Sequence, residues 1–150
     1  MSRPKRMMPP AYLAISIIVM ICLHFIWPEK QLIHWPWRAI GIVLIVLGFA
    51  LPVWANLLFK QAGTTVKPFQ QSSVIVTTGP YRFTRNPIYL GLTIMLIGIA
   101  IILGSLLPFF MIPIFVILIR VRVIPIEEKM LRDTFGNSYE EYCKKVRRWI

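Results

Sequence analysis

Residues 86–119 read NPIYLGLTIMLIGIAIILGSLLPFFMIPIFVILI, a stretch of 34 residues without a formal charge between Arg85 and Arg120. As one α-helix this stretch would be about 51 Å long, whereas the hydrocarbon core of a bilayer is about 30 Å thick. The stretch must therefore fold back on itself, and Gly104-Ser-Leu-Leu-Pro108 can form the turn. Such a hairpin returns both of its ends to the same side of a membrane.

The composition of the rest of the chain also indicates a membrane protein. Hydrophobic residues make up 57% of the 150 residues, and the mean hydropathy is +0.66. The apolar blocks are continuous and do not alternate, which excludes a β-barrel and leaves helices to satisfy the backbone in lipid. We predict an all-α integral membrane protein that forms a single membrane-embedded domain over residues 1–150. Four transmembrane helices are expected near residues 11–27, 38–59, 87–104 and 106–124, the last two forming a hairpin over residues 87–124.

Positive charges predict the orientation of these helices. Of the 17 Lys and Arg residues, only Lys30 and Arg38 lie between the first two helices. The other 15 lie in the N-terminal tail, in the loop 60–86 or from Arg120 onward. Because Lys and Arg accumulate on the cytoplasmic side, we expect both termini, this loop and the segment 125–150 to be cytoplasmic, in the cell membrane or an inner membrane. The segment 125–150 is expected to form amphipathic helices on the membrane surface.

The net charge of +11 has an explanation in the same arrangement. Basic residues that flank membrane helices contact anionic lipid headgroups, so membrane lipids are the expected partners. A nucleic-acid partner is not expected.

Small residues recur every seven positions in two of the predicted helices. Gly41, Gly48 and Ala55 do so in the second helix, and Gly91 and Gly98 do so in the third. This spacing keeps small residues on one face, where helix backbones can approach closely, so we expect the second helix to pack on the third. The alternative is that Gly91 and Gly98 leave room for a bound ligand.

Charged residues gather where the two ends of the hairpin meet. Arg85 precedes the hairpin, while Arg122, Glu127 and Glu128 follow it. A carboxylate at this depth needs a cationic partner, and Arg85, Arg122 or the ammonium group of a ligand can serve. Adjacent helix positions point about 100° apart, so at most one of the two glutamates is expected to face a pocket squarely.

The other polar residues narrow the class of ligand. Tyr81 and Tyr89 add aromatic faces that attract cations, so an amphiphilic or sulfonium-type cation is a sensible guest. His24 and His34 are expected on the opposite side of the membrane, and Cys143 stands alone near the C-terminus. A metal site therefore has no support.

At these residues the chain resembles the isoprenylcysteine carboxyl methyltransferases and their phospholipid N-methyltransferase relatives. The resemblance covers about residues 78–150 and consists of five motifs in the expected order and spacing. They are Gly79-Pro-Tyr-Arg82, Arg85-Asn-Pro-Ile-Tyr-Leu-Gly91, Glu127-Glu128, Phe135-Gly-Asn-Ser-Tyr-Glu-Glu-Tyr142 and Val146-Arg-Arg-Trp149. Each motif is weak by itself, and the ordered set is specific.

The resemblance implies an integral-membrane methyltransferase that uses S-adenosylmethionine and releases S-adenosylhomocysteine. It implies catalytic roles for Arg85, Asn86 and Glu128. It also implies a cofactor pocket at the cytoplasmic mouth of the hairpin, formed by Tyr81, Arg85, Asn86, Pro87, Tyr89, Leu90, Gly91, Gly98, Glu127 and Glu128.

The expected methyl acceptor is lipophilic and enters from the membrane, either like an isoprenylcysteine carboxylate or like a phospholipid amine. Asn86 departs from the His that the carboxyl methyltransferases usually carry, and the phospholipid relatives often have Asn there. A non-enzymatic four-helix membrane protein, such as an assembly factor or transporter component with a structural charge cluster, is the alternative.

Overall fold

A computed structural model describes residues 8–26, 31–63 and 74–150. Within these ranges the chain is helical and contains no strand. Its elements are α1 (Pro9–Ile26), α2 (Ala39–Gln61), the 3₁₀ turn η1 (Gly79–Arg82), α3 (Pro87–Leu103), α4 (Leu107–Leu118), the π-helical turn η2 (Ile119–Val123), α5 (Ile124–Phe135) and α6 (Asn137–Lys145). Of the expected loop 60–86, residues 64–73 lie outside the described part.

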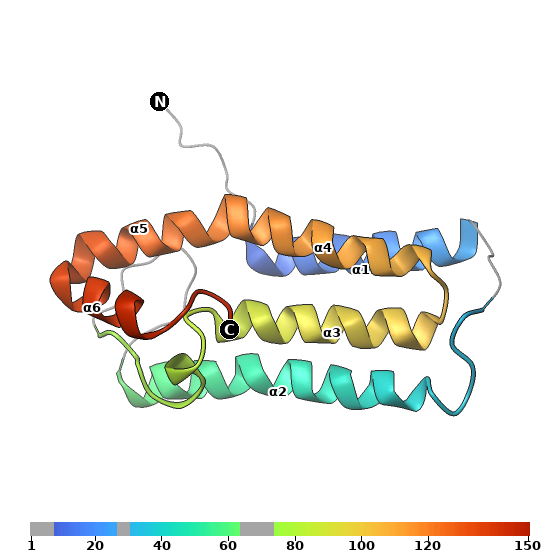
Figure 1. Cartoon of the computed structure of the whole chain (residues 1–150), viewed down its shortest axis with the longest axis horizontal. Helices are drawn as coiled ribbons and strands as arrows, with labels where there is room; N and C mark the ends of the chain where they lie inside the picture. The colour runs from blue at the N-terminus through green and yellow to red at the C-terminus, as the bar shows by residue number, and fades with distance from the viewer. Residues whose placement is uncertain (1–7, 27–30, 64–73) are drawn as a thin grey trace.

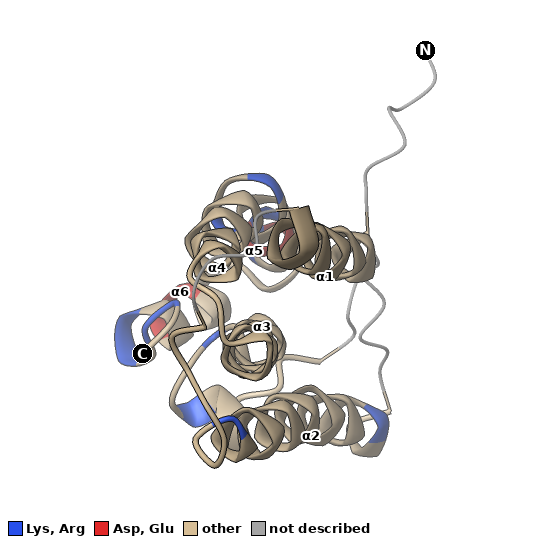
Figure 2. Cartoon of the chain, turned by 90° about the vertical axis from the view of Figure 1, so that its right-hand side faces the viewer, with Lys and Arg blue, Asp and Glu red and all other residues tan. Residues whose placement is uncertain are grey.

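The long helices form an elongated bundle with α3 at its centre. Seen along the bundle, α3 lies between α2 on one side and the pair of α1 and α4 on the other (Figure 2). The turn η1, helix α6 and the C-terminus gather at the end of the bundle where α3 begins (Figure 1). The charged motifs on either side of the hairpin are thereby brought to one end of the molecule.

Three helices are long and apolar enough to cross a membrane, namely Pro9–Ile26, Ala39–Gln61 and the continuous helix Leu107–Phe135. The fourth, α3, has 17 residues and is also apolar. At about 1.5 Å per residue it is roughly 26 Å long, close to the thickness of the hydrocarbon core. The helix expected to cross the membrane near residues 106–124 begins at Leu107 and continues without a break through η2 into α5.

Tight packing of α2 on α3 explains the repeated small residues. A Cβ atom added to Gly98 would lie 2.6 Å from the Gly41 carbonyl oxygen, and one added to Gly48 would lie 2.7 Å from the Gly91 oxygen. A Cβ atom on Gly91 would collide with the ring of Pro52. The expected packing is confirmed. Because α2 fills the space beside them, Gly91 and Gly98 leave no room for a ligand on this face, which corrects their assignment to the cofactor pocket.

The hairpin turns where the sequence indicated. Gly104 ends α3 with φ of 74°, a left-handed conformation that a glycine adopts at little cost. Its carbonyl oxygen accepts hydrogen bonds from the backbone N–H groups of Leu32 and Ile33, at 2.8 and 3.2 Å. The Arg38 side chain donates to the Ile33 oxygen at 2.9 Å and to the Leu103 oxygen at 3.4 Å. These bonds join the connection before α2 to the hairpin turn.

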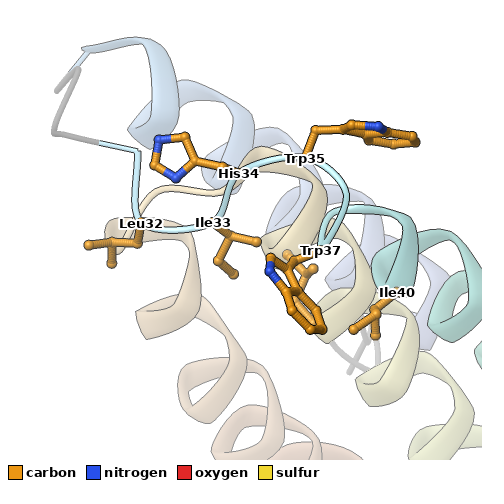
Figure 3. Close-up of a pocket in the computed structure, with 7 residues that line it drawn as sticks. Leu32, Ile33, His34, Trp35, Trp37 and Ile40 are labelled. Atoms are coloured by element: carbon orange, nitrogen blue, oxygen red, sulfur yellow. The ribbon is translucent and has the colours of Figure 1, made fainter.

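A pocket of about 600 Å³ lies at this same end, beside the C-terminal part of α3. Its lining is mostly apolar and aromatic, with Trp37 and Ile40 beside Leu32 and Ile33 (Figure 3). It lies at the opposite end of α3 from the charged residues, so this pocket is separate from the site that the charged motifs form.

Candidate active site

The charged residues converge where the start of α3, the helix α5 and the C-terminal segment meet. Glu128 of α5 is at the centre, and it is only 6% exposed. A buried carboxylate carries a large desolvation cost unless charged or hydrogen-bonding partners surround it. Its partners therefore define the site.

A change of helical register brings Glu128 to this position. Along α4 and η2 the buried residues Phe115, Ile119 and Val123 follow one another at intervals of four. After Val123 the series restarts one residue later, with Ile124 and Glu128 buried. The wider π-helical turn η2 takes up this extra residue, as π-bulges at functional sites commonly do. Without the shift, the glutamate before Glu128 would occupy the inward row.

Two arginines bind the Glu128 carboxylate. Arg148 donates from Nε to Oε1 at 3.0 Å and from Nη2 to Oε2 at 2.7 Å, a bidentate arrangement. Arg85 Nη1 lies 3.2 Å from Oε1. The hydrogen bonds to Glu128 raise the pKa of Arg148. Arg85 was an expected partner, while Arg122 is exposed. The basic residues of the expected surface helices in segment 125–150 would point to lipid headgroups, and for Arg148 this is wrong, because its side chain turns inward to Glu128.

The neighbouring glutamate has a different partner. Tyr89, on the first turn of α3, donates its hydroxyl hydrogen to Oε1 of Glu127 at 2.7 Å. Tyr89 is buried and Glu127 is half-buried. The two adjacent glutamates point in different directions, as expected from helix geometry, yet each contacts a residue at the start of the hairpin.

The C-terminal segment is tied to the residues just before α3. The backbone N–H of Arg85 donates to the Arg147 oxygen at 3.0 Å. The Thr84 hydroxyl and the Asn86 side-chain amide both donate to the Arg148 oxygen, at 3.2 and 2.9 Å. Asn86 is itself buried, so its amide serves to hold the backbone of the last residues over the site.

Aromatic side chains close the site on the α6 side. The Tyr142 hydroxyl donates to the Tyr81 carbonyl oxygen at 2.7 Å, and burial raises the pKa of both phenols. Both side chains therefore remain neutral near neutral pH. Nearby, Nη1 of Arg85 donates to Sγ of Cys143 at 2.7 Å. The thiol thus occupies a fixed place beside the arginine.

The remaining predicted residues fall on α3. Pro87 is buried at its first position, where the absent N–H costs no helical hydrogen bond. Leu90 is half-buried one turn on, next to Tyr89. Sequence reasoning overlooked several contacts at this site, made by Thr84, Tyr139, Tyr142, Cys143 and Arg148. The Val146–Trp149 motif marked this region without indicating which of its two arginines turns inward.

The donors and acceptors fit a small zwitterionic ligand. Glu128 offers anionic oxygens, Glu127 offers a second carboxyl group, and Tyr81 and Tyr89 offer aromatic faces. The Nε–H of Arg85 is buried and has no hydrogen-bond partner in the part of the chain that the structure describes. A buried donor of this kind is costly unless a group such as a ligand carboxylate pairs with it. Among residues 8–26, 31–63 and 74–150, no cluster of His, Cys, Asp and Glu has the composition of a metal site.

The family model for phospholipid methyltransferases matches residues 37–138, about two thirds of the chain and most of the site. The chain belongs to the phospholipid methyltransferase family. A probable protein-S-isoprenylcysteine O-methyltransferase of Oryza sativa subsp. indica is 30% identical over 117 residues, which cover 75% of this chain and 60% of the relative. The protein-S-isoprenylcysteine O-methyltransferase of Schizosaccharomyces pombe is 34% identical over 73 residues, covering 49% of this chain and 31% of the relative.

A solved structure is also similar to this family member. It is that of the eukaryotic intramembrane Ras methyltransferase, isoprenylcysteine carboxyl methyltransferase, with a TM-score of 0.71 and 31% sequence identity. The match covers 94% of this chain and 52% of that one, so the chain spans about half the length of this neighbour. The shared fold and the long apolar helices confirm the predicted all-α integral membrane protein.

Proposed function

We propose that this protein is an integral-membrane methyltransferase that uses S-adenosylmethionine to methylate a lipophilic acceptor. The observation that carries the proposal is the buried Glu128 carboxylate, with Arg85 and the Tyr89–Glu127 pair beside it at one end of α3. Membership of the phospholipid methyltransferase family supports it, and so do the isoprenylcysteine methyltransferases among the relatives. A non-enzymatic membrane protein would account for the helices but not for this family.

The cofactor would be held through both of its charged ends. Glu128, or Glu127 beside it, would bind the ammonium group of the methionine moiety, and the free Nε–H of Arg85 would bind its carboxylate. Tyr81 and Tyr89 would present aromatic faces to the sulfonium or the adenine. When bound, the cofactor supplies an electrophilic methyl carbon.

The residues of this chain would act mainly by positioning. Methyl transfer is an in-line displacement, so the barrier falls when donor and acceptor are held in near-attack geometry. Asn86 and Thr84 hold the C-terminal segment over the site, where it would shield the reacting groups from water. A carboxylate acceptor needs no general base, whereas an amine acceptor must lose a proton.

The site would lie on the cytoplasmic side, with both termini there, because 15 of the 17 Lys and Arg residues lie in the N-terminal tail, in the loop 60–86 or from Arg120 onward. The polar cofactor would then enter from the cytoplasm. The acceptor would enter from the bilayer, since the outer faces of the long helices are apolar.

Calorimetric titration with S-adenosylhomocysteine tests the cofactor assignment. The purified chain in lipid nanodiscs should bind it saturably. Glu128→Gln and Arg85→Ala should each weaken binding a few hundred-fold, since loss of one charge from a desolvated pair costs about 3–5 kcal/mol. Glu141→Gln, on the exposed side of α6, is the matched control and should bind like the parent. Equal affinity in all four proteins would refute the assignment.

A further inference from the structure

We propose that the Arg148 guanidinium is an internal placeholder for the cationic group of the ligand, and that it must leave Glu128 before the ligand can bind. The inference rests on the proposed function, because it takes Glu128 as the carboxylate that receives the ammonium group. It adds a competing residue that sets the affinity of that site.

Both oxygens of Glu128 are already occupied. Oε1 accepts from Nε of Arg148 and lies 3.2 Å from Nη1 of Arg85, and Oε2 accepts from Nη2 of Arg148. The Glu128 side chain is only 7% exposed, so little of the carboxylate remains open to a further donor. An incoming ammonium group therefore has to replace one of the two guanidinium groups.

Of the two arginines, Arg148 can leave the Glu128 carboxylate at the lower cost in free energy. Its side chain is 35% exposed, whereas that of Arg85 is 13% exposed and also donates to Cys143. Arg148 follows the end of α6 at Lys145, so no helix constrains its side chain. Its guanidinium can turn into water or toward lipid phosphates, which provide new partners for its donors.

The backbone of the same segment need not move. The Thr84 hydroxyl and the Asn86 amide hold the carbonyl oxygen of Arg148, and the Arg85 N–H holds that of Arg147. These bonds do not involve the guanidinium. The segment would thus stay over the site while only the side chain swings out.

A placeholder has a clear physical use. Without a ligand, a buried Glu128 with Arg85 alone would be poorly compensated, and Arg148 satisfies it. The Arg148–Glu128 pair lowers the apparent ligand affinity, because only the fraction of molecules with a free Glu128 carboxylate can bind.

The test is the affinity for S-adenosylhomocysteine in nanodiscs of neutral lipid. Arg148→Ala should bind about ten-fold more tightly than the parent, equivalent to about 1.4 kcal/mol. Arg148→Lys keeps a positive charge but loses the bidentate fork, so it should show a smaller gain in the same direction. Lys145→Ala removes one positive charge from the same exposed region and should leave the affinity unchanged.

The outcomes separate the two proposals. Weaker or unchanged binding in both Arg148 variants, with a parent that binds and a Glu128→Gln variant that does not, would overturn the placeholder alone. In that case Arg148 positions Glu128 for the ligand. A parent that fails to bind, or a Glu128→Gln variant that binds equally well, would overturn the cofactor assignment and the placeholder with it. If Arg148→Ala does not fold, the sign of the change in Arg148→Lys decides.

Discussion

Neutralising Glu128 should destabilise the folded chain much more than the same change at the adjacent Glu127. Glu128 is buried and is bound by two arginines, while Glu127 is half-buried and accepts one hydrogen bond from Tyr89. Glu128→Gln leaves two guanidinium groups without their counter-charge. Glu127→Gln leaves an amide oxygen that can still accept the Tyr89 hydroxyl.

The contacts allow a rough magnitude for each variant. Breaking a buried ion pair by removing one partner costs about 3–5 kcal/mol. The lower end, about 3 kcal/mol, applies to Glu128→Gln because Arg148 can turn to solvent. A hydrogen bond to a charged group contributes about 1.5–3 kcal/mol, and Gln keeps part of it, so Glu127→Gln should cost about 1 kcal/mol.

Thermal unfolding of the purified chain in one detergent measures this difference, with Glu141→Gln as the matched exposed control. We expect the midpoint to fall most for Glu128→Gln, less for Glu127→Gln, and hardly at all for the control. The ion-pair network would not anchor the C-terminal segment if Glu128→Gln unfolded at the temperature of the control. A larger fall for Glu127→Gln would show that the register shift at η2 has been misread.

Three further predictions address packing, ionisation and topology. Gly98→Leu should separate α2 from α3 and lower the midpoint of thermal unfolding by several degrees, because added core volume costs about 1–3 kcal/mol. Ala50→Leu, on the exposed face of α2, should leave the midpoint unchanged. Burial raises the pKa of the Tyr142 phenol above its ordinary 10.0, so this phenol should remain protonated at a pH at which a free phenol ionises. Stability should be constant below pH 10.0 and fall above it, because the unfolded chain ionises first. An unfolding titration that shows no loss of stability above pH 10.0 would contradict this. In intact cells, an impermeant thiol reagent should label a cysteine at Leu32 but not one at Gln61, and labelling of Gln61→Cys above the parent's background would invert the proposed orientation.

The course of the helices could be predicted because it depends on properties written locally in the chain. The charge-free length of residues 86–119 required a hairpin. Pro87 favours the first turn of a helix and Gly104 favours its end, and α3 runs from Pro87 to Leu103. The seven-residue spacing of glycines predicted the α2–α3 contact for a similarly local reason, since it fixes one face of each helix.

The direction of Arg148 could not be predicted from a helical pattern. An amphipathic helix extended through residues 144–148 places both Arg147 and Arg148 on the outer face. In the structure α6 ends at Lys145, and Val146 is extended with φ of −124° and ψ of 130°. Extended backbone sends successive side chains to opposite sides, so Arg147 is exposed and Arg148 reaches Glu128.

The register of the two glutamates depended on a similarly non-local feature. A regular α-helix through η2 would place Glu127 on the buried row, and only the π-helical turn moves Glu128 there. Pro125 lies just beyond this turn, where its ring disfavours a regular helix in the preceding residues. The proline signalled an irregularity, but its form depends on the packing of Ile119 and Val123 in the buried core.

Transfer of a labelled methyl group tests the proposed methyltransferase activity most directly. Membranes that contain the protein are supplied with methyl-labelled S-adenosylmethionine, and the products are partitioned between organic solvent and water. We predict label in the organic phase with the parent and with Glu141→Gln, and no label there with Glu128→Gln. Label that is released by base would identify a methyl ester, and label that is stable to base would identify an N-methyl product. Label confined to water-soluble products, or equal organic label with Glu128→Gln, would contradict the account.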